Sequence, residues 1–471
     1  NLTDGSILAS AGVMNPQIRF GEDLMSRVSY VMMHDGGERE LTDAVRKALD
    51  GLLASLANKA GIKRTEILEL SLVGNPIMHH LLLGIDPTPL GSAPFALAVD
   101  LAAEDGARWW RGVGYMGIVA GILILSFYSV IAGWVLDYVL RAASGDFVNI
   151  DAARAKEQFA AFVGNPMELL LWHTVFMVLT MAVVARGVTS GLERANKIMM
   201  PSLMVILLIL LGYSLAVGDV ARSIDFMFSP DFSKLTPAAI LSAMGHSFFT
   251  LSLGMGAVMV YGSYLQRHAS IARATFYVVL MDTAIALVAG ITIFAIVFAN
   301  QLEPAAGPGL LFQTLPIAFG HMPGGTLFAT LFFVLVGFAA WTSSISLVEP
   351  AVSWLTETTR LTRVRAALLV GGLIWLIGIA VLQSFNAWSE VKLFGLTIFD
   401  QLDKLTTNIL LPLGGLLMAL FAVWVMRAAH AQEELALNDR HYQRWLFVTR
   451  FVAPVAIVLV FLNLLGWLPF A

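Results

Sequence analysis

Nine long apolar runs, separated by short polar connections, dominate the chain after residue 112. Each run is long enough to cross the hydrocarbon core of a bilayer as a helix, which takes about 20 residues. The pattern therefore predicts a mainly α, polytopic membrane helical bundle with nine spans. The runs occupy residues 113–140, 167–186, 199–217, 240–264, 275–299, 326–348, 366–383, 408–426 and 446–468.

Basic residues alternate between the connections and predict an orientation. Cytoplasmic connections of membrane proteins carry an excess of Lys and Arg. The richer set of connections, predicted to be cytoplasmic, holds Arg186, Arg194, Lys197, Arg267, Arg273, Arg360, Arg363, Arg365, Arg427, Arg440 and Arg444. The poorer set, predicted to be external, holds Arg154, Lys156, Arg222, Lys234 and Lys392. This orientation places the N-terminal region in the cytoplasm.

One external connection, residues 302–322, is unusually long and apolar. It contains Pro304, Gly307-Pro308-Gly309 and Pro316. Proline fixes the backbone and glycine permits sharp turns, so the stretch can form either of two structures. It is either a structured re-entrant lid or a passive surface hairpin.

The residues before the first run have a soluble pattern. Residues 39–60 place apolar side chains at helical spacing, and residues 66–73 look like a short buried strand that leads into a helix with His79 and His80. Strand, turn and helix in this order predict a mixed α/β domain. Adjacent helical residues point in different directions, so the histidine pair does not predict a metal site.

Composition supports this division. The chain is 58% hydrophobic and 13% charged, with a mean hydropathy of +0.76 and no cysteine. Soluble domains are usually about 25% charged, so the chain is an integral membrane protein, and nothing in it indicates nucleic-acid binding. Residues 1–103 hold about a third of the charged side chains. We therefore predict a cytoplasmic domain at 1–103 and a membrane domain at 104–471.

The run at 240–264 contains the segment Ser252-Leu253-Gly254-Met255-Gly256. Glycine in a helix interior costs about 1 kcal/mol relative to alanine, so this helix can break in its middle. A broken membrane helix offers free carbonyls and helix ends to a ligand and its coupling ion. The alternative is that the glycines only allow neighbouring helices to pack closely.

Polar residues inside other runs point to the same kind of site. Asp282 lies within an apolar helix, where a carboxylate is costly and usually functional. Thr342, Ser343, Ser344 and Ser346 form a hydroxyl cluster that can serve either a ligand or helix packing. Oxygen ligands without cysteine or histidine clusters favour a hard cation over a transition metal. Together these groups suit a small zwitterion and a hard monovalent cation.

Two motifs in the N-terminal region carry a family resemblance. MNPQIRFGEDLMSR (14–27) and VGNPIMHHLLLGIDPTPLGSAPF (73–95) resemble the actin-like ATPase domain of the reductive activators of corrinoid proteins. The match is an internal piece of that domain, and the family's phosphate-binding loops and iron–sulfur domain have no counterpart here. The resemblance therefore implies a truncated actin-like ATPase fragment that does not hydrolyse ATP. The initial Asn indicates a fragment or a fusion.

From about residue 109 onward the chain resembles the bacterial amino-acid transporters of the neurotransmitter:sodium symporter family. The motifs are SPDFSKL (229–235), FFTLSLGMGA (248–257), GPGLLFQTLP (307–316) and FAAWTSSISLVEP (338–350). The resemblance implies a leucine-transporter type of bundle in the cell membrane, which is not an enzyme. Its partners would be an amino acid, sodium as the coupling ion and the lipid bilayer, with no other cofactor. Residues 113–140 would be the family's third helix and 240–264 its broken sixth.

The resemblance also implies roles for individual residues. The substrate would contact Ile124, Tyr128, Phe249, Thr250, Ser252, Met255, Ser343 and Leu347. The sodium sites would be formed by Thr250, Asp282, the carbonyl of Ala339, Thr342 and Ser343. Gates would be formed by Asp403 on the outside and by Tyr264 and Glu357 on the inside.

Three departures from the family pattern affect these expectations. His246 stands where the family usually has Gln, and Asp282 stands where several relatives have Asn, which would make chloride unnecessary. The pattern of the family's first two helices, a Gly-rich unwound segment followed by Arg-Phe-Pro, is missing from residues 1–108. The inverted repeat would then be incomplete, and the cavity hydroxyls and Asp282 would face an open groove.

The leading functional hypothesis is a sodium-coupled symporter of a neutral, hydrophobic amino acid that is inactive in this fused form. Two other classes of function remain open at this point. One is a membrane-tethered, ATP-dependent reductive activator of corrinoid proteins, and the other is a non-transporting membrane scaffold. The sequence does not indicate an oligomeric state.

Overall fold

A computed structural model of the protein describes two compact units, 1–96 and 97–471, and each is considered by itself. The described residues are 6–21, 27–28, 30–31, 34, 36–70, 72, 76–85, 87, 110–258, 262, 270–304, 307–359, 361–435 and 437–468.

The N-terminal unit is organised around one long helix. Its elements are η1 (Pro16–Phe20), α2 (Gly37–Ala60), η2 (Arg64–Glu66) and α3 (Pro76–Leu83). Leu41 of α2 is fully buried against Val31 and Leu81, and the Gln17 amide donates to the Leu41 carbonyl at 2.8 Å. Gly61 ends α2 in the left-handed conformation, with φ 67°. The helix predicted at 39–60 is confirmed.

The strand predicted at 66–73 is wrong for the residues that the structure describes. Glu66 ends the short helix η2, and residues 67–70 and 72 have no regular structure. The Leu68 side chain is 80% exposed. A strand needs a neighbouring strand to satisfy its backbone groups, and the described part of this unit contains none. The regular elements among the described residues of the unit are therefore all helical, and they do not display the predicted α/β arrangement.

The membrane unit contains eight helices long and apolar enough to cross a bilayer, counted over the described residues. Six are α6 (Arg111–Ser144), α8 (Pro166–Val184), α9 (Arg194–Val217), α13 (Ile271–Ala299), α15 (Gly325–Thr358) and α16 (Arg363–Gln383). The seventh comprises α17 (Ile398–Asp403), η7 (Lys404–Leu410), α18 (Leu411–Leu420) and η8 (Phe421–Val425). The eighth comprises α20 (Asp439–Phe447), η9 (Val448–Val452) and α21 (Ala453–Leu464). These confirm eight of the nine predicted spans; the ninth is interrupted.

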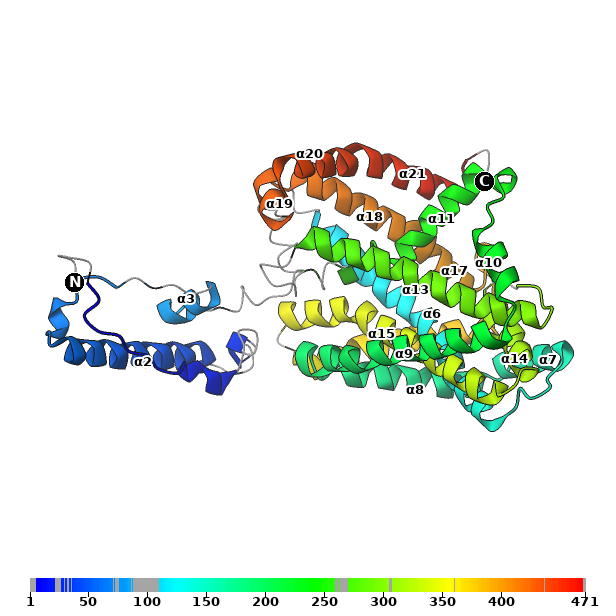
Figure 1. The fold of residues 1–471 in the computed structure, drawn as a ribbon, viewed down its shortest axis with the longest axis horizontal. Helices are drawn as coiled ribbons and strands as arrows, with labels where there is room; N and C mark the ends of the chain where they lie inside the picture. Colours follow the sequence, from blue (N-terminus) through cyan, green and yellow to red (C-terminus); the bar gives the residue numbers. More distant parts are fainter. Residues whose placement is uncertain are drawn as a thin grey trace. The chain divides into compact units, whose positions relative to one another are not determined.

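Helix α6 forms the core of this unit (Figure 1). It packs against α8, α15 and α16, and it is the most buried of the long helices. Its Trp134 lies edge-to-face against four phenylalanine rings at 5.0–6.4 Å, which fixes the middle of the bundle. At Gly133 an added Cβ would lie 2.9 Å from the backbone of α8, so glycine permits this close helix contact.

The long connection 302–322, predicted to be external, is largely helical and packed over its described residues. It contains η6 (Leu310–Thr314) and α14 (Leu315–Gly320), and the Phe312 and Phe319 side chains are buried. The Tyr138 hydroxyl donates to the Phe312 carbonyl at 3.1 Å. Of the two predicted alternatives, the packed lid agrees with the structure and the passive surface hairpin does not.

Candidate functional site

The interrupted span is the main irregularity of the bundle. Helix α11 (Pro237–Thr250) ends in the middle of the predicted run, and its closing bond joins the Leu253 N–H to the Phe248 carbonyl at 2.8 Å. Ser252, Gly254 and Gly256 follow with φ of 55°, 82° and 78°. Only glycine adopts such angles without strain, so Ser252 is held in an unfavourable conformation. The predicted break at Ser252–Gly256 is confirmed.

The irregular segment 251–256 fits between α6 and α18 because glycines line its path. On the α6 side, a Cβ on Gly117 would lie 3.2 Å from the Gly256 nitrogen. On the other side, a Cβ on Gly254 would lie 2.3 Å from the Leu411 carbonyl oxygen. Backbone thus contacts backbone on both sides of the break.

Gly254→Ala is expected to destabilise the protein, because it combines a left-handed φ with a backbone clash. The melting temperature of the detergent-solubilised protein should fall by about 5 °C or more. Gly372→Ala is the matched control, since a Cβ at Gly372 meets nothing within 4 Å and alanine favours a helix. Equal melting temperatures for the two variants would show that the break tolerates a side chain.

A cavity of about 620 Å³ lies beside the break. It gathers side chains from α6, α9, α11, α13 and α15, together with the irregular segment. Ten of the residues predicted to form the site line it: Ile124, Tyr128, Phe249, Thr250, Ser252, Met255, Asp282, Thr342, Ser343 and Leu347. Residues separated by more than 200 positions in the sequence thus share one space.

Hydrogen bonds join the predicted site residues within the bundle. The Tyr128 side chain bonds that of Ser343, linking α6 to α15. The Thr342 hydroxyl donates to the Ala339 carbonyl at 3.0 Å, so two of the oxygens assigned to a sodium site are neighbours. Ala339 itself does not line the cavity, but its carbonyl is accessible to Thr342 on the same helix turn.

Further residues line the cavity without having been assigned a role. His246 and Ser346 had been noted for their chemistry, whereas Asn196, Met200 and Ala257 had been missed. The sequence did contain a signal for Asn196 and Met200 of α9, because residues four positions apart lie on one face of a helix. The Asn196 Oδ1 atom is buried and has no hydrogen-bond partner among the described residues.

One side of the cavity is open. His246 and Thr250 of α11 are exposed, and Asp282 of α13 is only partly buried. Of the apolar stretch of α13 only 17% is buried. Polar groups of membrane helices normally face protein or a water-filled cavity. The open side agrees with the expected groove that exposes hydroxyls and Asp282.

The predicted gate residues do not line this cavity. Asp403 ends α17, where its backbone carbonyl accepts the Thr407 hydroxyl at 2.6 Å. Glu357 lies in the last turn of α15 and is partly buried. Tyr264 lies outside the described residues.

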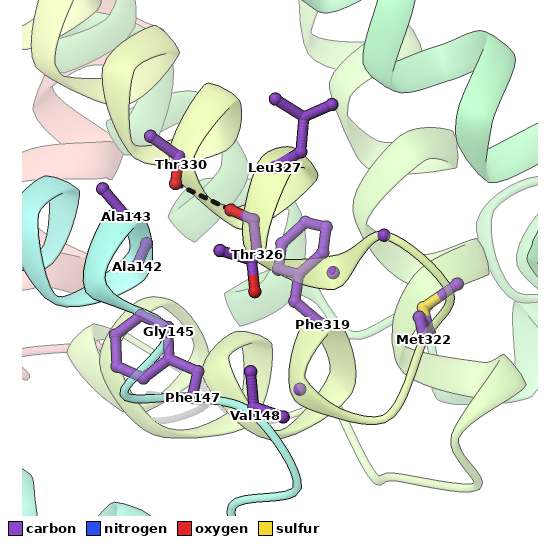
Figure 2. Close-up of a pocket in the computed structure, with 13 residues that line it drawn as sticks. Ala142, Ala143, Gly145, Phe147, Val148, Phe319, Met322, Thr326, Leu327 and Thr330 are labelled. Atoms are coloured by element: carbon purple, nitrogen blue, oxygen red, sulfur yellow. Dashed lines mark hydrogen bonds between the residues drawn. The ribbon is translucent and has the colours of Figure 1, made fainter.

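A second cavity, of about 570 Å³, lies where α6 ends and α15 begins (Figure 2). Its polar side chains are those of Thr326 and Thr330, and the Thr330 hydroxyl donates to the Thr326 carbonyl at 2.7 Å. The described residues around it contribute no ionisable side chain. The chemistry expected for an ion and a zwitterion is therefore concentrated in the first cavity.

Comparisons with known proteins point to one family of transporters. Residues 158–467 match the family model described as the sodium:neurotransmitter symporter family. An uncharacterized sodium-dependent transporter of Bacillus subtilis (strain 168), YhdH, is 39% identical, over 79% of this chain and 84% of that protein. A similarly named protein of Haemophilus influenzae is 33% identical, over 76% of this chain and 79% of its own.

A solved structure supports the same fold. The crystal structure of MhsT in complex with L-phenylalanine matches with a TM-score of 0.72 and 40% identity, over 79% of this chain and 85% of that one. Separately, residues 1–107 match the family model described as the RACo middle region. Both resemblances drawn from the sequence motifs are thus confirmed. The relatives are transporters, not enzymes.

Proposed function

Because the chain belongs to the sodium:neurotransmitter symporter family, we propose that its cavity beside α11 binds a neutral, hydrophobic amino acid together with sodium. The family and its relatives establish a multi-pass membrane protein of a sodium-dependent transporter class. The observation that carries the finer proposal is the composition of the cavity. Hydroxyls and one carboxylate line it together with aliphatic and aromatic side chains.

The proposed substrate contacts use both kinds of side chain. The Tyr128 hydroxyl, already bonded to Ser343, is placed to donate to a substrate carboxylate. Phe249 covers the site, and Ser252 and Thr250 contribute polar groups at the helix break. Ile124, Met255 and Leu347 supply an apolar wall for the side chain.

The proposed sodium ligands are oxygen atoms, as a hard cation requires. One group is the Ala339 carbonyl with the hydroxyls of Thr342 and Ser343. The other is Thr250 with Asp282, whose carboxylate supplies negative charge beside the cavity. The Thr342 hydroxyl donates to the Ala339 carbonyl, so the two oxygens are neighbours, and breaking this hydrogen bond would free lone pairs on both for a cation. Asp403, Glu357 and Tyr264 remain proposed gate residues, and residues 1–103 are proposed to be cytoplasmic.

Substrate selectivity tests this proposal. The protein should be a chimera in which the first two helices of the B. subtilis relative are placed before Trp109, for the reason argued in the Discussion. Leucine and phenylalanine are expected to compete for sodium-dependent binding of radiolabelled leucine, while arginine and glutamate should not. The apolar wall offers no partner for a charged side chain, and an unpaired buried charge costs several kcal/mol. Stronger competition by arginine or glutamate would contradict the proposed substrate class.

Asp282→Asn tests the role of the carboxylate in the same chimera. Removing the negative charge should make sodium-dependent uptake require chloride or abolish it, because the anion can replace the lost charge. Thr283→Val is a neighbouring control on the same helix, since the Thr283 hydroxyl donates to the Val279 carbonyl of its own helix and does not line the cavity. Unchanged sodium and chloride dependence in Asp282→Asn would remove Asp282 from the ion site.

A further inference from the structure

The last span presents a face that carries charge at one end and apolar side chains along the rest. The span Asp439–Leu464 lies at the edge of the bundle beside α11 and α18 (Figure 1), and only 6% of its apolar stretch is buried. Arg440, Gln443, Arg444, Phe447 and Val448 line a hollow along α20 and the start of η9. Their spacing of three and four residues puts them on one helix face.

The opposite face of α20 holds the helix in place. Tyr442 is buried, and its hydroxyl donates to the Ala428 carbonyl of α19 (Ala428–Leu435) at 3.4 Å. Its ring stacks with Trp445 at 5.8 Å. Because Tyr442 points toward α19, the face that carries Arg440 and Arg444 points away from the protein.

The two guanidinium groups lack acidic partners among the described residues. Neither Arg440 nor Arg444 forms an ion pair there. The nearest acid in the sequence, Asp439, accepts a hydrogen bond from Gln432 at 3.0 Å. Glu434 on α19 is exposed and likewise makes no ion pair with a described residue. Two unneutralised positive charges therefore lie side by side at the end of a membrane span.

The apolar part of the face continues toward the middle of the membrane. Beyond Phe447, which is 60% exposed, it includes Phe451 at 51% and Val455 at 61%. Eleven residues separate Arg444 from Val455, which is about 16 Å along a helix. This length is roughly half of a 30 Å hydrocarbon core, as an acyl chain of one leaflet requires.

We propose that this face binds an anionic phospholipid. Its phosphate would pair with Arg440 and Arg444, and one acyl chain would lie along Phe447, Phe451 and Val455. Charge complementarity selects an anionic headgroup, and the apolar length selects a lipid over free phosphate or an acidic peptide. Basic pockets at the ends of membrane helices bind such headgroups in general. The site is separate from the amino-acid cavity, so the proposal does not depend on transport.

Native mass spectrometry of the purified full chain can measure the bound lipid. We expect one phosphatidylglycerol to bind more tightly than phosphatidylcholine. Arg440→Gln/Arg444→Gln should weaken phosphatidylglycerol binding about thirtyfold. This figure takes the effect of removing one basic side chain from an anionic surface and applies it to each of the two arginines. Arg440→Lys/Arg444→Lys should retain most of the affinity, because the charge remains.

The matched control is Arg273→Gln/Arg365→Gln, which removes the same charge from exposed positions at the starts of α13 and α16. It should leave phosphatidylglycerol binding within about twofold of the unaltered chain. An equal loss in both double variants would reduce the effect to net charge and overturn the proposal. Three other results would also overturn the proposal. They are equal binding of phosphatidylcholine, tight binding of inorganic phosphate alone, and a dimer whose mass includes no lipid.

Discussion

Proteoliposomes that contain only this 471-residue chain are expected to accumulate no amino acid when a sodium gradient is applied. The oxygens proposed for sodium come from α11, α13 and α15, from the residues Thr250, Asp282, Ala339, Thr342 and Ser343. Two of these residues lie at the open side of the cavity, where Thr250 is exposed and Asp282 is only partly buried. A cation that leaves water needs ligands on all sides to offset the lost hydration. A half-shell therefore does not support the coupled step.

The same opening prevents closure around the substrate. In this family the site is formed at the interface of two repeats, and transport requires one part to rock against the other around it. The motif expected for the first two helices is absent from residues 1–108. Residues 1–107 match a different family model, so they offer no obvious replacement.

The measurement is the accumulation of radiolabelled leucine in proteoliposomes, with sodium outside or with choline in its place. The chimera that carries the first two helices of the B. subtilis relative is the comparison, and it should accumulate leucine at least tenfold above the choline background. Robust accumulation by the unaltered chain, lost when the sodium gradient is dissipated, would contradict the prediction. It would mean that residues 1–108 or a second polypeptide completes the site. Failure of both proteins would instead challenge the proposed function.

Much of the membrane unit was predictable because hydrocarbon imposes strict demands on sequence. Long apolar runs predicted eight spans, although some of the observed helices extend up to ten residues beyond the predicted bounds, and the glycines at 254 and 256 marked the broken helix. The hydroxyls and Asp282 were conspicuous for the same reason, since polar groups in lipid are costly. Their convergence on one cavity needed the family resemblance, because periodicity does not specify which helices are neighbours.

Other features depended on tertiary contacts that no local pattern encodes. The prediction of a strand at 66–73 was wrong because a short apolar run cannot be assigned to a strand without a neighbouring strand. No described residue pairs with it. Asn196 and Met200 were missed because they lie at the start of an apolar run, where an amide looks like a helix end. The packing of the external lid became clear only from the burial of Phe312 and Phe319.

The buried ion pair between α15 and α16 was not predicted either, because its partners are fourteen positions apart in the sequence. The Glu349 side chain is fully buried, and its Oε2 atom accepts a bond from Arg363 at 2.6 Å. Its Oε1 atom accepts the Ser353 hydroxyl at 2.9 Å. The Arg363 Nε atom donates to the Val184 carbonyl at the end of α8 at 2.8 Å. The ion pair thus links the interior of α15 to the start of α16 and, through Arg363, to the end of α8.

Arg363→Gln is therefore expected to be among the most destabilising single changes in this chain. Removing one partner of a buried ion pair typically costs about 3–5 kcal/mol. The melting temperature of the detergent-solubilised protein, followed by tryptophan fluorescence, should fall by about 10 °C. Glu349→Gln should be similarly harmful, because it leaves the Arg363 guanidinium, 21% exposed, without its anion.

The double variant Glu349→Gln/Arg363→Gln separates the ion pair from simple packing. Neither remaining amide carries a charge, so the double variant should be more stable than either single variant, and the coupling energy should exceed about 1 kcal/mol. Arg365→Gln is the matched control, because that side chain is exposed on the same helix turn. Single variants no less stable than Arg365→Gln would show that Glu349 is buried without its charge, and that α8, α15 and α16 are held together here by packing alone.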